Sequence, residues 1–240
     1  DLDYSNIVTS SVVTMVKSGT IINLVSSDSA LQSMLTLSPS PVIGSTATTG
    51  TLTWSFASGS EKFDYLAAGE SLVLTYTIRV TDSNSPATTA DRVIIITING
   101  TNDAPTITLV GGDSAASSLT ETDTSLSTSG TLTVTDLDYT NTVVASVVSV
   151  VASGITAGIG SDNAALLAMF AITPTNILSN TATSAQLTWN FNSGSEAFDY
   201  LATGQVLTLT YVVQAVDSNG TPATGTRNVI ITITGTNDVP

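Results

Sequence analysis

The sequence predicts an all-β protein built from two tandem antiparallel β-sandwiches, each with one short helix, arranged end to end. Three observations support this fold class: an internal repeat, short β-branched segments separated by turns, and a single helical signal in each copy. The repeat has a spacing of 135 residues, and 21 of the 34 positions in Thr51–Asn84 are identical to their partners in Gln186–Asn219. We therefore predict two copies of one module, residues 1–105 and residues 106–240.

The first copy begins late in the repeat. Asp1-Leu2-Asp3-Tyr4 already corresponds to Asp136-Leu137-Asp138-Tyr139, so the first copy has no counterpart of residues 106–135. We expect this N-terminally truncated module to miss one or two edge strands. The chain also starts without the basic and apolar regions of a signal peptide, which suggests an internal piece of a longer protein.

Alternating and β-branched segments mark the strands. Thr51–Phe56 alternates polar and apolar residues, so it reads as a half-buried strand in which Trp54 anchors the core, and Trp189 has the same place in the second copy. The helical signal follows Ser27 and Asp28, either of which can cap a short helix that Pro39 prevents from extending far.

Composition excludes several classes of function. Five Lys and Arg against nineteen Asp and Glu give a net charge of -14, which disfavours nucleic acid and anionic membranes and suits cation binding. The chain has no Cys and no His, so it lacks thiolate chemistry and the commonest general base, and we expect no enzyme. No apolar run reaches the roughly 18 residues of a membrane span, so no membrane insertion is expected.

The segment that closes each copy is rich in oxygen ligands. The first copy ends in Asn99-Gly100-Thr101-Asn102-Asp103-Ala104-Pro105, and the chain ends in Thr234-Gly235-Thr236-Asn237-Asp238-Val239-Pro240. Short polar side chains and main-chain carbonyls are the ligands that Ca²⁺ prefers. The alternative is that these are hinge or Asx-turn residues that bind no metal.

The strands, the turns and above all this closing signature resemble the VCBS repeat of very large, RTX-type bacterial surface adhesins. The resemblance covers essentially the whole chain, twice. More loosely, the sequence resembles the calcium frame of cadherin repeats, which has a linker of the form Asp-x-Asn-Asp-Asn-x-Pro, an Asp-x-Asp turn, a third Asp turn and an early Glu. The positions that match are Asn99, Asn102, Asp103 and Pro105 in the linker, Asp136, Asp138 and Asn141 in the Asp-x-Asp turn, Asp217 in the third turn, and Glu121.

Two sets of metal ligands follow from this resemblance. The first is a Ca²⁺ site at the junction of the modules. Its ligands would be Asp64, Asn99, Asn102 and Asp103 from one side and Asp136, Asp138 and Asp217 from the other. Asp64 is not followed by the family's Glu, which departs from the pattern. The second set comprises half-sites at the two outer ends: Glu121, Asp199 and Asp238 at one, and Asp1, Asp3 and Asp82 at the other.

The resemblance implies Ig-like or cadherin-like sandwiches that serve as the calcium-stiffened stalk of a secreted adhesin, in cell adhesion or biofilm formation. It further implies type I secretion to the bacterial cell surface and a monomer that contacts adjacent repeats, with any host or surface glycan or protein bound by other regions. The alternative is a carbohydrate-binding module that uses Tyr65 and Tyr200 as stacking platforms. Glu61 and Glu196 could be read as the general acid of a glycosidase, but a duplicated catalytic site would add little to the function of a stalk.

Overall fold

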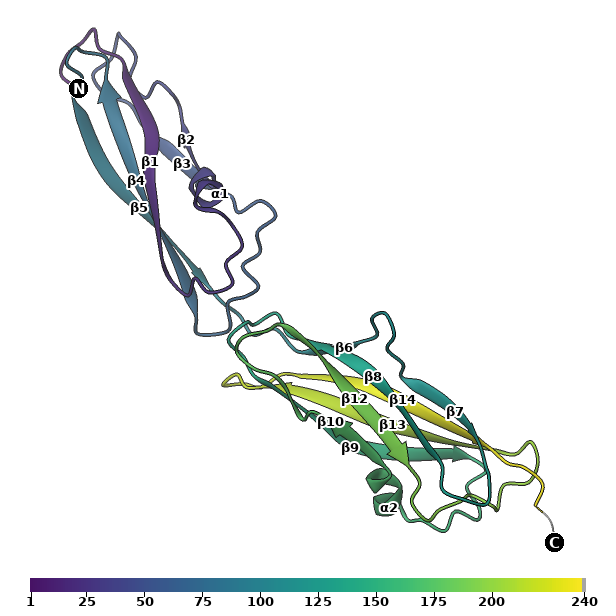
Figure 1. Ribbon diagram of the computed structural model, residues 1–240. Helices are drawn as coiled ribbons and strands as arrows, with labels where there is room; N and C mark the ends of the chain where they lie inside the picture. Colours follow the sequence, from purple (N-terminus) through teal and green to yellow (C-terminus); the bar gives the residue numbers. More distant parts are fainter. Residues whose placement is uncertain (239–240) are drawn as a thin grey trace. The chain divides into compact units, whose positions relative to one another are not determined.

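The chain divides into two compact units, residues Asp1–Thr101 (unit 1) and Asn102–Pro240 (unit 2). The computed structural model describes residues 1–238 and is shown in Figure 1. The division falls four residues before the predicted boundary between residues 105 and 106. Each unit is a β-sandwich with one short helix, so the predicted all-β sandwich fold of the two modules is confirmed.

Unit 2 consists of two sheets packed face to face. One sheet has the strand order β10-β12-β8-β6, and the other has the order β11-β9-β13-β14-β7, in which β7 pairs in parallel with β14. The elements are β6 (Thr106–Thr108), β7 (Ala116–Thr120), β8 (Ser127–Thr135), β9 (Val143–Gly154), α2 (Asn163–Ala168), β10 (Phe170–Thr173), β11 (Asn176–Leu178), β12 (Ser184–Asn192), β13 (Val206–Asp217) and β14 (Thr224–Thr234).

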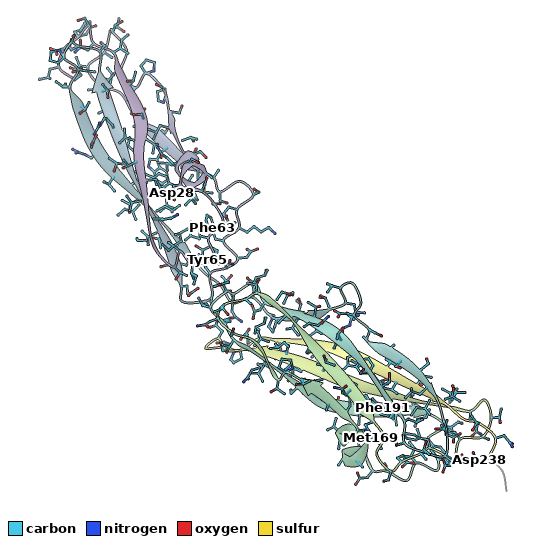
Figure 2. All side chains as sticks on the ribbon, in the orientation of Figure 1. Asp28, Phe63, Tyr65, Met169, Phe191 and Asp238 are labelled. Atoms are coloured by element: carbon cyan, nitrogen blue, oxygen red, sulfur yellow. The ribbon has the colours of Figure 1, made fainter. Side chains whose placement is uncertain are left out.

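The inward-facing side chains of β12 and β13 form the centre of this core. Trp189 and Tyr211 are fully buried, and Phe170 stacks on both, with ring centroids 5.6 Å and 4.4 Å away. The Tyr211 hydroxyl donates a hydrogen bond to the carbonyl oxygen of Leu166 in α2 over 2.9 Å. Figure 2 marks Phe191, another buried residue of β12. Alternation along each strand therefore supplies the core, as the sequence pattern predicts.

Unit 1 repeats this arrangement with fewer strands. Its sheets have the orders β1-β4-β5 and β2-β3. The bounds of five elements coincide with those of β9, α2, β10, β13 and β14 after the 135-residue shift: β1 (Val8–Gly19), α1 (Asp28–Ser33), β2 (Leu35–Ser38), β4 (Ser71–Asp82) and β5 (Thr89–Asn99). The strand β3 (Thr53–Phe56) has four residues, whereas its counterpart β12 has nine. Residues 1–101 include no counterparts of β6, β7 and β8.

The two repeated tryptophans differ in burial. Trp189 is 0% exposed and Trp54 is 51% exposed, so the prediction of Trp54 as a core anchor is wrong. Within residues 1–101, β3 pairs only with β2, whereas β12 of unit 2 pairs with both β10 and β8. In unit 2, a Cβ on Gly130 of β8 would lie 2.5 Å from the Trp189 ring, and the indole Nε1 donates to the carbonyl oxygen of Ser114 over 2.7 Å.

Both helices begin where the sequence predicts. Ser27 caps α1 by accepting a hydrogen bond from the amide of Ala30, and Asp162 caps α2 by accepting one from Ala165. Each helix has six residues. Within residues 1–238, no helix has the length and apolar character needed to cross a membrane.

Candidate metal centres

Five of the predicted ligands gather at one end of unit 2, in a cluster that we call the N-terminal carboxylate cluster (Asn102, Asp103, Asp136, Asp138 and Asp217). The antiparallel pairing of β6 with β8 places Thr106 opposite Thr135, so the residues before β6 lie beside those after β8. Asp217 ends β13 at the same place, opposite the start of β9 at Val143. Strand register thus brings together residues that are 115 positions apart in the sequence.

Hydrogen bonds connect the members of this cluster. The Asn102 side-chain amide donates to Oδ2 of Asp217 over 2.9 Å, and the backbone amide of Asp103 donates to Oδ2 of Asp138 over 2.8 Å. Asn141 donates to the same Asp138 oxygen over 3.1 Å. The segment before β6 is therefore attached to two different loops of unit 2.

Two carboxylates of the cluster are buried, and one oxygen of each has no hydrogen-bond donor within residues 1–238. Asp136 is 2% exposed and Asp138 is 1% exposed. Oδ2 of Asp136 and Oδ1 of Asp138 are buried and accept no hydrogen bond from the described residues. A buried charge without a partner is costly, so these oxygens are suited to a ligand that brings positive charge.

The pKa values of both groups reflect this environment. Burial raises the pKa of Asp136 to about 6, and the charges of Asp217 and Asp103 add to the effect. Burial also raises the pKa of Asp138 to about 6, with further contributions from Asp136, Asp103 and Asp217. Near neutral pH the cluster therefore concentrates negative charge that a divalent cation could neutralise.

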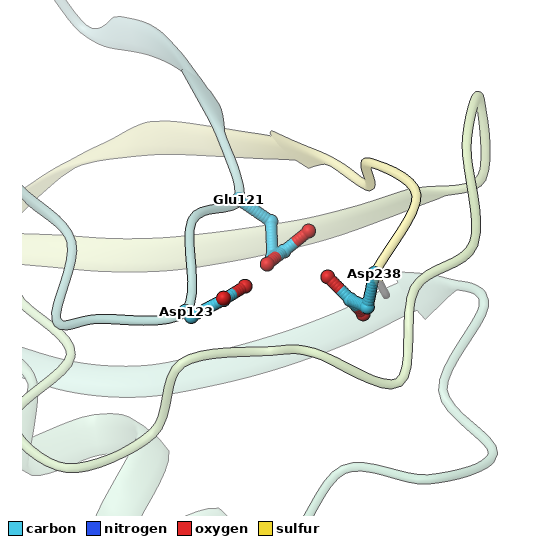
Figure 3. Close-up of side chains that lie close together, drawn as sticks. All are labelled: Glu121, Asp123 and Asp238. Atoms are coloured by element: carbon cyan, nitrogen blue, oxygen red, sulfur yellow. The ribbon is translucent and has the colours of Figure 1, made fainter. Parts of the chain in front are cut away.

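A second group, the C-terminal carboxylate cluster (Glu121, Asp123, Asp199 and Asp238), lies at the opposite end of the strands. Carboxylate oxygens of Glu121, Asp123 and Asp238 lie within 4.8 Å of one another, and Figure 3 shows the three side chains pointing toward a common space. Within residues 1–238, this is the one trio of acidic side chains that meets this distance.

Glu121 is the buried member of this second cluster. It is 0% exposed, and its Oε2 accepts hydrogen bonds from the backbone amide and the hydroxyl of Thr236 at 3.0 Å and 2.8 Å. Its Oε1 is buried and has no hydrogen-bond partner in the part of the chain that the structure describes. Burial, followed by the charge of Glu121, raises the pKa of Asp199 and of Asp238.

Asp123 was not among the sequence-predicted ligands. It follows Glu121 by two positions, the same spacing that separates Asp136 from Asp138. The Glu-x-Asp pattern is therefore the signal that could have identified it.

Unit 1 contains counterparts of some members of the N-terminal cluster, namely Asp1, Asp3 and Asp82. Asp1 and Asp3 are exposed, and the side-chain amide of Asn6 donates to both carboxylates over 3.3 Å and 3.2 Å. Hydrogen bonds from the hydroxyl and backbone amide of Thr88 lower the pKa of Asp82. Asp64 and Asn99 are exposed residues of unit 1, and their participation in one site with Asp136 and Asp138 stays a prediction.

The alternative site residues are engaged in contacts within their units. Tyr65 is only 7% exposed and donates from its hydroxyl to the carbonyl of Thr20, and Tyr200 donates in the same way to Ile155. These contacts do not favour open platforms for sugars. Glu61 and Glu196 accept hydrogen bonds from the hydroxyls of two serines, Ser26 and Ser161, that precede the helices.

Comparison with solved structures finds distant similarities. Protocadherin Gamma B2 extracellular cadherin domains 1-5 match 98% of this chain with a TM-score of 0.41 and 12% identity, and mouse Cadherin-23 EC22-24 matches 98% with 0.38 and 16%. CfaE, the adhesive subunit of CFA/I fimbria of enterotoxigenic Escherichia coli, matches 75% with 0.35 and 11%. The chain spans 34%, 56% and 62% of those three chains. No protein-family profile and no curated protein sequence matches the chain.

Proposed function

We propose that both units are calcium-binding spacer modules of a secreted bacterial surface adhesin of the VCBS type. The observation that carries this proposal is the pair Asp136 and Asp138, which are buried among further carboxylates and each keep one oxygen without a hydrogen bond. The unpartnered Oε1 of Glu121 at the other end supports it independently. Oxygen ligands in this number suit a hard cation that accepts six to eight of them.

Calcium would act mechanically. Without a cation, the repulsion between Asp136, Asp138 and Asp217 opposes closure of the loops that carry them. With a cation, the same loops and the segment at Asn102 and Asp103 share one ligand set, which restricts the backbone where the chain enters unit 2. A rod of such modules would stiffen when Ca²⁺ binds.

The setting of this function is outside the cell. Extracellular modules bind Ca²⁺ with dissociation constants of about 10⁻⁴ to 10⁻³ M, so the modules would take up the ion after export. In this proposal the protein is a monomeric, non-enzymatic stalk that contacts adjacent repeats and is exported by type I secretion. Other regions of the adhesin would bind the host or surface partner in adhesion or biofilm formation.

Calorimetric titration with Ca²⁺ tests the proposal. The wild type should bind with affinity in this range, and its melting temperature should rise relative to the protein in EDTA. Asp138→Asn should weaken the sites at the N-terminal cluster, and Glu121→Gln should weaken those at the C-terminal cluster. Asp91→Asn is the matched control, because it removes an exposed carboxylate of unit 1 that pairs with Arg79. No binding heat, together with equal melting curves in Ca²⁺ and EDTA, would refute the proposal.

A further inference from the structure

The chain contains two Asn-Gly pairs, Asn99-Gly100 and Asn219-Gly220. In such a pair the backbone nitrogen of the glycine can attack the side-chain carbonyl carbon of the asparagine, because glycine has no Cβ to crowd the approach. The two pairs occupy different backbone environments. Asn99 is the last residue of β5, whereas Asn219 lies in the loop of residues 218–223 that connects β13 to β14.

The backbone amide of Gly220 faces the side chain of Asn219. It donates a hydrogen bond to Oδ1 of Asn219 over 2.7 Å. Since Cγ is one C=O bond of about 1.23 Å from that oxygen, the nitrogen lies within about 4 Å of Cγ. The other atom of the side-chain amide, Nδ2, is buried and has no hydrogen-bond acceptor within the part of the chain that the structure describes. The attacking nitrogen is therefore held near the carbon it would attack, a proximity that favours reaction.

The surroundings of Gly220 leave room for this reaction. Gly220 is exposed, and an added Cβ would have no atom within 4 Å. Its φ lies outside the left-handed region that favours glycine, so neither packing nor backbone conformation requires a glycine here. The nitrogen can move toward Cγ without displacing packed atoms, and solvent water reaches the product.

Asn99-Gly100 is held in the opposite way. Asn99 pairs with Ser71 in the ladder between β4 and β5, and the amide of Gly100 donates to the carbonyl oxygen of Glu70 over 2.9 Å. A Cβ on Gly100 would lie 2.2 Å from the carbonyl oxygen of Leu66, so the backbone is closely packed. Attack by this nitrogen would require the chain to leave the ladder and break that hydrogen bond.

We propose that Asn219 is a site of spontaneous deamidation and that the fold protects Asn99 from the same reaction. The nitrogen of Gly220 loses its proton to solvent base and forms a bond to Cγ of Asn219. The bond between Cγ and Nδ2 breaks, and Nδ2 takes up a proton and leaves as ammonia. Water then opens the resulting succinimide ring at either carbonyl carbon, which gives aspartate or isoaspartate. In isoaspartate the main chain runs through Cβ and Cγ, which adds one backbone atom between residues 219 and 220.

This added atom affects Asp217, a member of the N-terminal carboxylate cluster. Oδ1 of Asp217 accepts hydrogen bonds from the backbone amides of Asn219 and Ala223, each over 3.1 Å, and Oδ2 accepts a further one from Ala223 over 3.1 Å. A longer backbone between these two amides changes their separation, so both cannot keep their places on one carboxylate. Oδ2 also accepts from Asn102, which connects the modified loop to the segment before β6.

The test incubates the full chain in EDTA at mildly alkaline pH and follows both asparagines by peptide mass spectrometry. In the folded protein, Asn219 should deamidate at least about tenfold faster than Asn99, or about 1.4 kcal/mol in activation free energy. In urea the two rates should become similar, because only the fold distinguishes the pairs. Gly220→Ala, which the space around residue 220 accommodates, should slow the reaction at Asn219 and leave the melting temperature unchanged.

Hydrogen exchange tests the consequence for Asp217. The amide of Ala223 should exchange faster in the isoaspartyl form than in the unmodified protein. Asn219→Asp is the matched control, because it carries the added charge on an ordinary backbone and should keep this amide protected. Equal deamidation of Asn219 and Asn99 in the folded protein, or an unchanged rate in Gly220→Ala, would overturn the proposal. Equal exchange at Ala223 in all three forms would overturn its consequence for Asp217.

Discussion

The backbone amide of Asp103 donates a hydrogen bond to Oδ2 of Asp138 over 2.8 Å. This contact joins the segment before β6 to the loop after β8, and it uses one oxygen of a carboxylate whose other oxygen is buried without a hydrogen bond. The stability of unit 2 should therefore depend on how the charge of this carboxylate is compensated.

The first prediction concerns pH in the absence of cations. The folded-state pKa values of Asp136 and Asp138 are about 6, above the ordinary 3.8, so the folded state holds more protons than the unfolded state between these values. Stability should fall as pH rises from about 4 to 6, on the order of 2 kcal/mol for each of the two carboxyl groups. Thermal unfolding in EDTA, followed by Trp189 fluorescence in Trp54→Phe, measures this change.

Calcium provides the control for this trend. Because a bound cation stabilises the ionised carboxylates, millimolar Ca²⁺ should flatten or reverse the dependence between pH 4 and 6.

Below pH 4, Asp113 has the opposite effect on stability, which falls as pH falls. Burial raises its pKa, but hydrogen bonds from Thr131, Thr133, Val110 and Gln186 outweigh this effect and lower the pKa to about 2. Its contribution is present above the ordinary value and is lost as pH falls toward 2.

The second prediction concerns the glycine of the closing signature. A Cβ on Gly235 would lie 2.1 Å from the carbonyl oxygen of Leu201, so Gly235→Ala must displace backbone and should destabilise unit 2 by about 1–3 kcal/mol. Gly220→Ala is the matched control, because no atom lies within 4 Å of its added Cβ. Urea denaturation compares the two, and equal midpoints would contradict this account.

The third prediction concerns the hydrogen bond between sheet and helix. Tyr211→Phe removes the 2.9 Å hydrogen bond to the carbonyl of Leu166 in a fully buried site and should cost about 0.5–1.5 kcal/mol. Tyr200→Phe removes a similar bond, 2.8 Å to Ile155, from a partly exposed side chain, and should cost less. Denaturant midpoints that rank in the reverse order would show that the buried bond contributes little.

Much of the fold could be predicted because the two copies carry the same local signals. Alternation in Thr51–Phe56, the cap at Ser27 and the late start of the first copy all follow from single segments or from their repetition. The exposure of Trp54 could not be read from its own strand, since the burial of a strand residue depends on neighbours that are distant in sequence.

The sequence also predicted some residues of the candidate sites and missed one. Asp136, Asp138 and Asp217 were identified from motif positions, and strand register does bring them together. Asp123 was not predicted, because its Glu-x-Asp spacing is the only local signal and an exposed Asp at such a position is commonly a solvated turn residue. Its significance depends on Asp238, which lies 115 residues later and reaches the same place only in the folded chain.

The attachment of Asn102 and Asp103 to unit 2 also matters for anyone who produces that half alone. A recombinant piece that starts at Thr106, at the apparent end of the connector, would discard the donors to Asp217 and Asp138. Under the proposed function, such a piece should bind Ca²⁺ more weakly than the full chain, because it lacks two of the proposed ligands. A piece that starts at Asn102 keeps both hydrogen bonds.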